Sequence, residues 1–331
     1  MKRRRLGSSD LEVSALSFGA WQLGDSGYWG QDPNIDEQAA VDAAIDAGIT
    51  LFDTAEGYAR GESERALGRL LGPKRKDVLI ASKVSPNHCA PADLRAACEA
   101  SLQRLGTDVI DLYQVHWPIR DVPAADAYGE LERLQTEGKI RAIGVSNFGP
   151  EDLDDWFASG SCVSDQLGYN LLFRAIEYEI VPACRKYNLG ILVYMPVLQG
   201  ILAGRWKSVD EIPENRRRTR HFSGDREGVR HGEPGCEELT FKVLGDIAGI
   251  AEEVGQPMAT VAMAWLLAKP GVTSVIIGGR NPRQVTRNVG AADLELSAEV
   301  VGRLDEATEP LRAYFGRNCD MWQPAGNSRI R

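Results

Sequence analysis

The chain has 331 residues, 43% of them apolar, and a net charge of −9 from 38 basic and 47 acidic side chains. This composition is typical of a globular protein with a large core, and the acidic balance argues against a nucleic-acid partner. No stretch approaches the roughly 18 apolar residues of a membrane span, and the basic N-terminus lacks the apolar segment of a secretory signal. We therefore expect a cytoplasmic protein with neither a membrane nor a nucleic-acid partner, and the sequence leaves its oligomeric state open.

The cysteines and histidines show no metal-binding pattern. Six scattered cysteines form no C-x-x-C pair, and four histidines form no H-x-x-x-H pair. Cysteines without such spacing are predicted to be buried thiols in a reducing cytosol. A structural or catalytic metal is therefore not expected.

Eight short apolar runs are predicted to be strands, and each is apolar on both faces, as parallel strands covered by helices are. In chain order they are Ala15–Gly19, Gly48–Phe52, Val78–Ala81, Val109–Val115, Ala142–Val145, Val163–Leu167, Gly190–Tyr194 and Thr273–Ile277. The helical patterns are Ser63–Leu71, Pro91–Leu105, Ala125–Glu137, Glu151–Ala158, Glu177–Tyr187, Glu238–Val254, Ala259–Ala268, Pro282–Val289 and Ala298–Ala307. This alternation predicts a closed (β/α)8 barrel, the TIM-barrel fold. An open doubly wound sheet is the alternative, but no glycine fingerprint follows the first run.

Three segments lie outside this repeat. Residues 1–14 are predicted to form a short hairpin at the bottom of the barrel, and residues 308–331 form a C-terminal tail. Residues 199–237 form a long loop in the seventh unit, and loops of this length in a compact domain are usually functional or disordered. No linker-like composition divides the chain, so we expect one domain over residues 1–331.

Polar residues at the ends of three neighbouring strands are the candidate catalytic groups. Asp53 ends the second run, Tyr58 lies in the loop after it, Lys83 ends the third run and His116 follows the fourth. In a barrel of this kind the chemistry takes place at the C-terminal ends of the strands. Neighbouring strands are about 4.8 Å apart, so three strand ends span roughly 10 Å and these side chains can meet in one pocket.

Together these groups can polarise and protonate a carbonyl oxygen. A free phenol has a pKa of about 10, and a nearby ammonium favours the phenolate and lowers that pKa. Asp53 can hold Lys83 by a charge-assisted bond, and His116 can bond the carbonyl oxygen. None of the four supplies a hydride, so a nicotinamide cofactor is needed.

Each of these residues also has a structural interpretation. An Asp–Lys pair is often only an ion pair, and a buried histidine is often only a core group with its hydrogen bonds satisfied. Four such groups at consecutive strand ends favour the catalytic interpretation, because charged groups are rarely buried without partners.

Seven stretches resemble those of the aldo-keto reductase family in order and spacing: FDTAEGYARGESERALG, IASKV, DLYQVHWP, IRAIGVSNF, DQLGYNLL, YMPVLQGILAGR and IIGGRNPRQVTRN. The resemblance runs from Phe18 to about Leu304 and looks closest to the bacterial branch with inositol- and sugar-associated oxidoreductases. It implies a (β/α)8 barrel that binds NADPH across its mouth. It also implies that the catalytic tetrad is Asp53, Tyr58, Lys83 and His116, with Tyr58 as the proton donor.

The resemblance further implies the residues that hold the cofactor. Ser146, Asn147 and Gln166 match the groups that bond the nicotinamide carboxamide, and their donors and acceptors suit it. Tyr194 matches the aromatic ring that stacks on the nicotinamide, with a core aromatic as the alternative.

Matches to the rest of the cofactor follow in the loop after Tyr194 and in the last repeat helix. Those along the pyrophosphate are Leu198, Gly200 and Arg205, and those around the adenosine are Gly278, Gly279, Arg280, Gln284 and Asn288. Arg280 matches the basic group at the 2′-phosphate, next to a helix N-terminus that favours anions. Arg283 or Arg287 could supply a second basic group. The expected cofactor is NADP(H), with NAD(H) possible.

The basic run Asn215–His221 in the long loop has two interpretations. The first is a solvated loop. The second is that Arg216–Arg218 or Arg220 folds over the cofactor phosphates, since basic clusters commonly serve phosphate groups.

Aromatic residues occur where the family builds its substrate pocket: Trp21, Tyr28, Trp29, Trp117 and Trp322. For Tyr28 and Trp117 the alternative is that they only pack the mouth of the barrel. Aromatic walls hold a sugar ring, an aryl aldehyde or a quinone equally well. We therefore expect NADPH-dependent reduction of aldehydes or ketones, or oxidation of the corresponding sugar or polyol alcohols. The alternatives are an NAD-dependent sugar or polyol dehydrogenase, and a non-catalytic NADP-sensing regulatory subunit.

Overall fold

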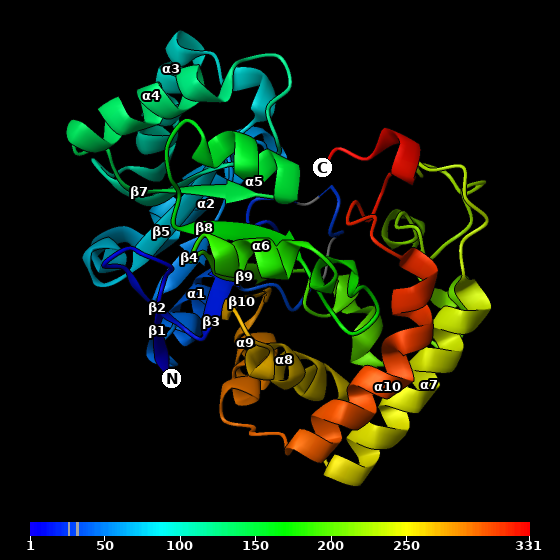
Figure 1. Cartoon of the computed structure of the whole chain (residues 1–331). Helices are drawn as coiled ribbons and strands as arrows, with labels where there is room; N and C mark the ends of the chain where they lie inside the picture. The colour runs from blue at the N-terminus through cyan, green and yellow to red at the C-terminus, as the bar shows by residue number, and fades with distance from the viewer. Residues whose placement is uncertain (26, 31–32) are drawn as a thin grey trace.

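The computed structural model describes residues 1–25, 27–30 and 33–331. Eight parallel strands close into a barrel in the order β10-β3-β4-β5-β6-β7-β8-β9, which confirms the predicted (β/α)8 fold (Figure 1). All eight predicted strands are present, with small shifts at their ends: β3 Leu16–Gly19, β4 Leu51–Asp53, β5 Leu79–Val84, β6 Ile110–Val115, β7 Ile140–Ser146, β8 Ser164–Gly168, β9 Gly190–Tyr194 and β10 Val272–Ile277.

Side chains alternate across the barrel wall, and both faces are apolar. Leu51, Ala81 and Leu112 belong to the cluster inside the barrel, whereas Phe52 and Ile80 pack in the larger cluster beneath the surrounding helices. Successive side chains of a strand point to opposite faces, so burial on both faces explains the continuous apolar runs in the sequence.

The predicted N-terminal hairpin is also present, as β1 Arg3–Arg5 paired antiparallel with β2 Glu12–Ser14. Fully buried Leu6 packs in the cluster inside the barrel. Gly7 has a φ of 53°, and a Cβ there would lie 2.1 Å from the carbonyl oxygen of Val163, just before β8. The hairpin therefore closes the end of the barrel opposite the C-terminal ends of the strands.

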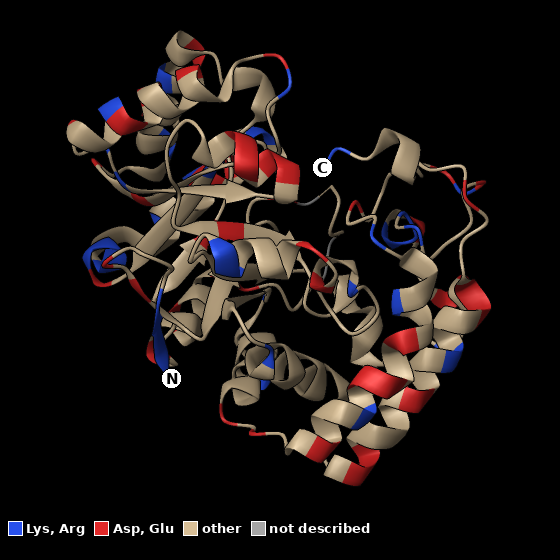
Figure 2. Cartoon of the chain, in the orientation of Figure 1, with Lys and Arg blue, Asp and Glu red and all other residues tan. Residues whose placement is uncertain are grey.

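The helices surround this barrel: α1 Glu37–Asp46, α2 Glu62–Leu71, α3 Pro91–Leu105, α4 Ala124–Thr136, α5 Pro150–Phe157, α6 Ile180–Lys186, α7 Glu237–Val254, α8 Met258–Ala268, α9 Pro282–Val289 and α10 Ala298–Phe315. Helices α7 and α10 pack side by side (Figure 1). Acidic and basic residues are interspersed along these outer helices (Figure 2).

The predicted helices differ from the structure at three places, of which α1 and α6 are the first two. Helix α1 was not predicted, because its buried side chains are small (Ala40, Val41 and Ala44). The predicted helix Glu177–Tyr187 is divided into a 3-10 turn Ala175–Glu177 and α6. The division follows from Pro182 in α6, whose ring would clash with a helical carbonyl four residues earlier.

Helix α10 extends beyond the predicted end at Ala307. It continues to Phe315 with Pro310 inside it, and Thr308, Leu311 and Phe315 are buried. The tail without α-helix therefore begins after Phe315 rather than at residue 308, and it contains one 3-10 turn, Ala325–Asn327.

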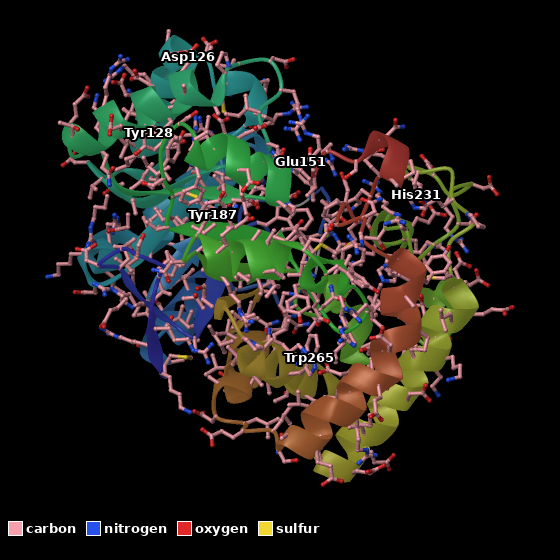
Figure 3. The ribbon with its side chains drawn as sticks, viewed as in Figure 1. Asp126, Tyr128, Glu151, Tyr187, His231 and Trp265 are labelled. Atoms are coloured by element: carbon pink, nitrogen blue, oxygen red, sulfur yellow. The ribbon has the colours of Figure 1, made fainter. Side chains whose placement is uncertain are left out.

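The long loop contains only 3-10 turns, Leu198–Ala203, Val209–Glu211 and Glu214–Arg216. It packs against the end of α10, where Tyr314 Oη donates to Gly235 O at 2.9 Å and Arg220 lies 5.4 Å over the Phe315 ring. Figure 3 labels His231 in this loop, and its side chain is buried. The loop is thus part of the packed fold.

All six cysteines are free thiols, five of them buried and Cys319 partly exposed.

None of the described helices is long and apolar enough to cross a membrane. Within residues 1–25, 27–30 and 33–331, no group of three or more His, Cys, Asp or Glu could hold a metal ion.

Candidate active site

A cavity of about 410 Å³ opens at the C-terminal ends of the strands. Most of the residues singled out from the sequence line it: Trp21, Trp29, Asp53, Tyr58, His116, Trp117, Ser146, Asn147, Gln166, Tyr194, Gly200, Arg205, Gly278, Gly279, Arg280, Gln284, Asn288 and Trp322. Lys83, Leu198 and Tyr28 lie behind this lining.

Lys83 lies directly behind the polar floor of the cavity, which Asp53 and Tyr58 line. Its side chain is fully buried, and its ammonium donates to Asp53 Oδ1 at 2.7 Å, Thr54 O at 2.9 Å and Tyr58 Oη at 3.1 Å. These three acceptors use all three N–H bonds of the ammonium. The parallel register of β4 and β5, in which Asp53 pairs with Ala81, brings the acid and the lysine together.

Tyr58 stands on a turn with unusual backbone conformations. Ala59 and Arg60 have φ values of 46° and 57°, which residues other than glycine seldom adopt. Gly61 follows with φ 87°, and a Cβ there would lie 2.6 Å from Arg104 Cδ. Backbone strain of this kind concentrates at functional sites.

The pKa of Tyr58 is raised above its usual value, because burial and Asp53 together outweigh the opposing charge of Lys83. The sequence predicted a lowered pKa from the ammonium alone, and that direction is wrong for the net effect. The pKa of Lys83 is also raised: burial lowers it, but Asp53 and Tyr58 outweigh burial. At neutral pH the site therefore pairs a protonated phenol with an ammonium.

His116 follows β6, and its ring lies edge-on to the Tyr58 ring with centroids 5.6 Å apart. Burial lowers its pKa to about 3, with smaller effects from the charges of Lys83 and Arg329. A neutral imidazole keeps one donor and one acceptor nitrogen. His116 can therefore hydrogen-bond a neutral oxygen at physiological pH without adding charge.

The second oxygen of Asp53 belongs to an amide network inside the barrel. It accepts from Gln166 Nε2 at 2.7 Å and from Gln114 Nε2 at 3.4 Å. Gln166 also donates to Gln114 Oε1 at 3.4 Å. Gln114 was not predicted from the sequence; its signal was that it is one of two polar residues, with Asp111, in the buried strand β6.

Asn147 connects the strand ends on the other side of the floor. It has a φ of 63°, its amide donates to His116 O at 3.1 Å and Ser146 Oγ at 3.0 Å, and its oxygen accepts from Tyr194 Oη at 2.7 Å. The Ser146 hydroxyl donates to Gln166 O at 2.8 Å. The four residues that match the nicotinamide end are therefore joined by hydrogen bonds.

The chain turns sharply after β9. Leu198 and Gln199 have φ values of 43° and 54°, and Gly200 has a φ of 96°. Leu198 is buried in the core. A Cβ at Gly200 would lie 3.0 Å from Arg205 Nη2, so glycine allows the guanidinium to lie against the backbone of the turn.

Four guanidinium groups line the cavity: Arg205, Arg216, Arg280 and Arg287. The pKa of Arg216 is lowered by burial and by the charges of Arg205 and Arg280, so these groups lie near one another. Arg216 lies over the rings of Trp29 and Trp206, at 5.5 and 5.6 Å. Positive charge is therefore concentrated in the part of the cavity that these arginines line.

The interpretation of Asn215–His221 as a solvated loop is only partly right. Arg218 is exposed, but Arg216 lines the cavity, while Arg220 and His221 are buried. Arg220 donates to Glu233 Oε2 at 2.8 Å, so it contributes to packing of the loop.

Helix α9 begins at the edge of the cavity. Asn281 caps it by accepting from Gln284 N at 3.0 Å, and Asn288 Nδ2 donates to Gly278 O at 2.8 Å. A Cβ at Gly279 would lie 2.6 Å from Val285 Cγ2. Glycine therefore lets the chain pass close to the helix, whose first N–H groups favour an anion.

Arg280 links α9 to the first loop. Its Nη1 donates to the carbonyl oxygens of Trp29 and Gly30, both at 2.9 Å, and its backbone N donates to Gln284 Oε1 at 2.9 Å. Arg280 thus holds the loop that carries Trp29 while it lines the cavity.

Aromatic rings form two walls of the cavity. Trp21 contacts Trp29 and Tyr58, with ring centroids 5.0 and 6.0 Å apart. Tyr28, for which substrate binding and packing of the barrel mouth were both open, is not among the lining residues; its ring stacks on that of Trp21 and its Oη donates to Asn215 O at 2.8 Å. The Tyr28 side chain therefore joins the first loop to the long loop.

Trp117 and Trp322 form the second wall, with ring centroids 6.0 Å apart. The Trp322 ring is nearly parallel to the Tyr194 ring, with an interplanar angle of 12° and centroids 6.3 Å apart. The tail therefore reaches back to the strand ends.

Further lining residues were missed from the sequence: Gln22, Met195, Pro196, Val197, Gln199, Ala203, Ala259, Met263, Ile276 and Ile277. Most are apolar and look like ordinary core residues in a sequence. Gln22 had a usable signal, a polar residue just after a strand, and it donates to Gly19 O at 2.6 Å and to Gly279 O at 3.2 Å.

Comparison with known proteins agrees with this geometry. The model of the Aldo/keto reductase family matches residues 15–309. The chain belongs to the aldo/keto reductase family. The predicted family is thereby confirmed, and with it the assignment to NAD(P)H-dependent oxidoreductases.

Several bacterial relatives are similar over nearly the whole chain. The NADH-specific methylglyoxal reductase of Escherichia coli (strain K12) is 30% identical, covering 94% of this chain and 99% of the relative. An aldo-keto reductase of Klebsiella pneumoniae, solved in complex with NADPH, is 33% identical with a TM-score of 0.72, covering 92% of this chain and 94% of that one. A glycerol dehydrogenase of Gluconobacter oxydans is 28% identical with a TM-score of 0.79, covering 96% of both chains.

Proposed function

We propose that this aldo-keto reductase reduces aldehydes or ketones with NADPH, and that Tyr58 donates the proton to the carbonyl oxygen. The observation that carries the proposal is the contact of Lys83 Nζ with both Tyr58 Oη (3.1 Å) and Asp53 Oδ1 (2.7 Å) on the cavity floor. Lys83 favours the phenolate left after proton transfer, and Asp53 fixes Lys83. The raised pKa keeps the phenol protonated before transfer.

His116 is proposed to orient the carbonyl oxygen. Its neutral ring lies beside Tyr58, so it can donate one hydrogen bond to the oxygen as negative charge develops there. The nicotinamide, when bound, supplies the hydride. Trp21, Trp117 and Trp322 are proposed to hold the apolar part of the substrate and to exclude water.

The lining residues fit a dinucleotide phosphate. Two buried donors, Trp29 Nε1 and Arg216 Nε, have no hydrogen-bond partner among the described residues, and buried donors of this kind need an acceptor. We propose that Arg205 and Arg216 bind the pyrophosphate, and that Arg280 binds the 2′-phosphate, with Gln284 and Asn288 at the adenine.

The nicotinamide end is proposed to bind through Ser146, Asn147, Gln166 and Tyr194. The amide hydrogens of Gln166 and Asn147 are engaged within the protein. The Gln166 oxygen is therefore the atom we propose to accept from the carboxamide, while the Tyr194 ring stacks on the nicotinamide.

A second candidate is NAD-dependent oxidation of a sugar or polyol. The name of the NADH-specific methylglyoxal reductase of Escherichia coli supports the use of NAD(H). The name of the glycerol dehydrogenase of Gluconobacter oxydans supports oxidation of a polyol. The same residues would serve this direction, with Tyr58 as the base.

The test is turnover of 4-nitrobenzaldehyde with NADPH or NADH, followed by a panel of sugars and polyols with NADP or NAD. We expect aldehyde reduction to be faster with NADPH. Faster polyol oxidation with NAD would favour the second candidate. Binding of NADPH with no turnover of any compound would contradict both and point to a cofactor-sensing subunit.

A further inference from the structure

An ion pair in the tail supports the wall formed by Trp117 and Trp322. The Arg329 guanidinium lies 3.6 Å over the Trp117 ring and 5.8 Å over the Trp322 ring. Its Nε and Nη2 donate to the two carboxylate oxygens of Asp320, at 2.7 and 2.8 Å. The side chain of Asp320 is fully buried. A bidentate pair fixes orientation as well as distance.

The same carboxylate organises the backbone of the tail. Asp320 Oδ1 accepts from Trp322 N at 3.0 Å, and Oδ2 accepts from Arg329 N at 3.2 Å. Arg120, on the loop that follows Trp117, donates to Arg329 O at 2.7 Å. Asp320 thus holds the backbone of Trp322 directly, and Arg329 extends the connection to the Trp117 ring and, through Arg120, to the loop after it.

This ion pair lies close to the proposed catalytic groups without lining the cavity itself. Trp322 is nearly parallel to Tyr194, and Arg329 is among the charges that lower the pKa of His116. The orientation of the two indoles therefore decides how much room remains beside His116 and Tyr58.

We propose that Arg329 is a specificity-determining residue that sets the shape of the carbonyl end of the cavity by clamping Trp322 against Trp117 through Asp320. The inference rests on the proposed carbonyl reduction. Indoles held in one orientation present preformed apolar faces. Such faces bind a flat aromatic ring well and add little to the binding of a short aliphatic chain. The clamp therefore favours carbonyl compounds that carry an aromatic ring over short aliphatic ones.

The experiment compares Arg329→Met, which keeps an unbranched stem without the charged fork, with wild type. The substrates are 4-nitrobenzaldehyde and propanal with NADPH. We expect kcat/KM for the aryl aldehyde to fall by about 5- to 30-fold through KM, the scale of a desolvated cation–π contact. Propanal turnover and NADPH affinity should hardly change. Arg329→Lys, which keeps the charge, should recover part of the loss.

The matched control is Arg303→Met, which breaks an exposed pair with Glu253 and should leave both substrates unaffected. Equal losses for the two aldehydes, or a parallel loss of NADPH affinity, would overturn the proposal. If Arg329→Met fails to fold, Asp320→Asn tests the proposal instead, because it removes the carboxylate charge and keeps the shape of the side chain. We expect the same selective rise in KM for the aryl aldehyde.

Failure of the proposed function gives a different result. A wild type that turns over neither aldehyde contradicts carbonyl reduction, but aldehyde affinities can still be measured by quenching of tryptophan fluorescence. A selective loss of aryl-aldehyde affinity in Arg329→Met would then support the clamp, and equal affinities in variant and wild type would overturn it.

Discussion

The pKa of Tyr58 depends on opposing neighbours within a few ångströms. Burial and Asp53 raise it, and Lys83 lowers it. In the proposed mechanism the reduction needs the phenol, so its rate should fall as pH rises through this pKa, whereas alcohol oxidation would need the phenolate and should rise through it. The direction in which the pKa of Tyr58 changes when either neighbour is removed can therefore be predicted.

We predict that Lys83→Met raises the pKa of Tyr58 further, because the cation that favours phenolate is lost. The pH at which alcohol oxidation rises should move upward. Asp53→Asn is the matched variant and should lower the pKa of Tyr58, since it removes a charge that raises this pKa. The measurement is the pH–rate profile of each variant, and a Lys83→Met profile identical to wild type would show that Lys83 does not tune Tyr58.

Single residues were predictable where the polar side chain follows an apolar strand. Asp53, Lys83 and His116 stand at strand ends, so the barrel topology alone places them together. Gln114 and Arg329 were not predictable in this way, because their roles depend on contacts between segments far apart in the chain. The sign of the Tyr58 shift also needed the structure, since it depends on burial.

At the level of elements, we propose that the first turn of α9 decides cofactor choice. The helix offers free N–H groups and Arg280 adds a guanidinium that can bond a phosphate bidentately. NADH lacks the 2′-phosphate. The same arginine also holds the carbonyls of Trp29 and Gly30, so its loss can weaken both cofactors somewhat.

We predict that Arg280→Ala reduces the preference for NADPH over NADH by roughly 10- to 150-fold, the range for hydrogen bonds to charged groups. Arg283→Ala, an exposed arginine on the same helix that does not line the cavity, is the control and should keep the preference. Both affinities are measured by quenching of tryptophan fluorescence. A variant that loses NADPH and NADH affinity equally would mean that Arg280 is not the selector.

Element boundaries were predictable where burial is extensive. The strands are buried on both faces and their apolar runs are continuous, so all eight were found. Helix α1 has only small buried side chains, and α10 contains Pro310, a residue that is unfavourable inside a helix. In α10 the burial of Leu311 and Phe315 outweighs the lost backbone hydrogen bond.

For the whole molecule, the barrel fold could be predicted from the alternation of strand and helix. The conformations of the tail and of the long loop could not be predicted in this way. We propose that residues 1–331 form one domain, because a single cluster of buried side chains extends from Leu16 to Met321. The long loop is held to it partly through His221, whose Nε2 bonds Leu172 O at 2.9 Å. Burial lowers the pKa of His221 to about 4.

We predict that this histidine makes the molecule less stable in mild acid. Its ordinary pKa is about 6.5, so between pH 6.5 and 4 the unfolded chain binds a proton that the folded chain does not. Stability therefore falls as pH decreases through this window. Urea midpoints at pH 7 and pH 5 should differ less in His221→Gln than in wild type. An equal difference would show that His221 stays charged or exposed.

We propose above all that Tyr58 donates the proton. The direct measurement is steady-state reduction of 4-nitrobenzaldehyde by Tyr58→Phe, with NADPH affinity measured in parallel and Tyr314→Phe, an exposed tyrosine, as control. We predict that Tyr58→Phe lowers kcat by about two to four orders of magnitude, the range of general acid catalysis, with NADPH affinity and the control unchanged. A Tyr58→Phe enzyme with near-wild-type turnover would contradict the account.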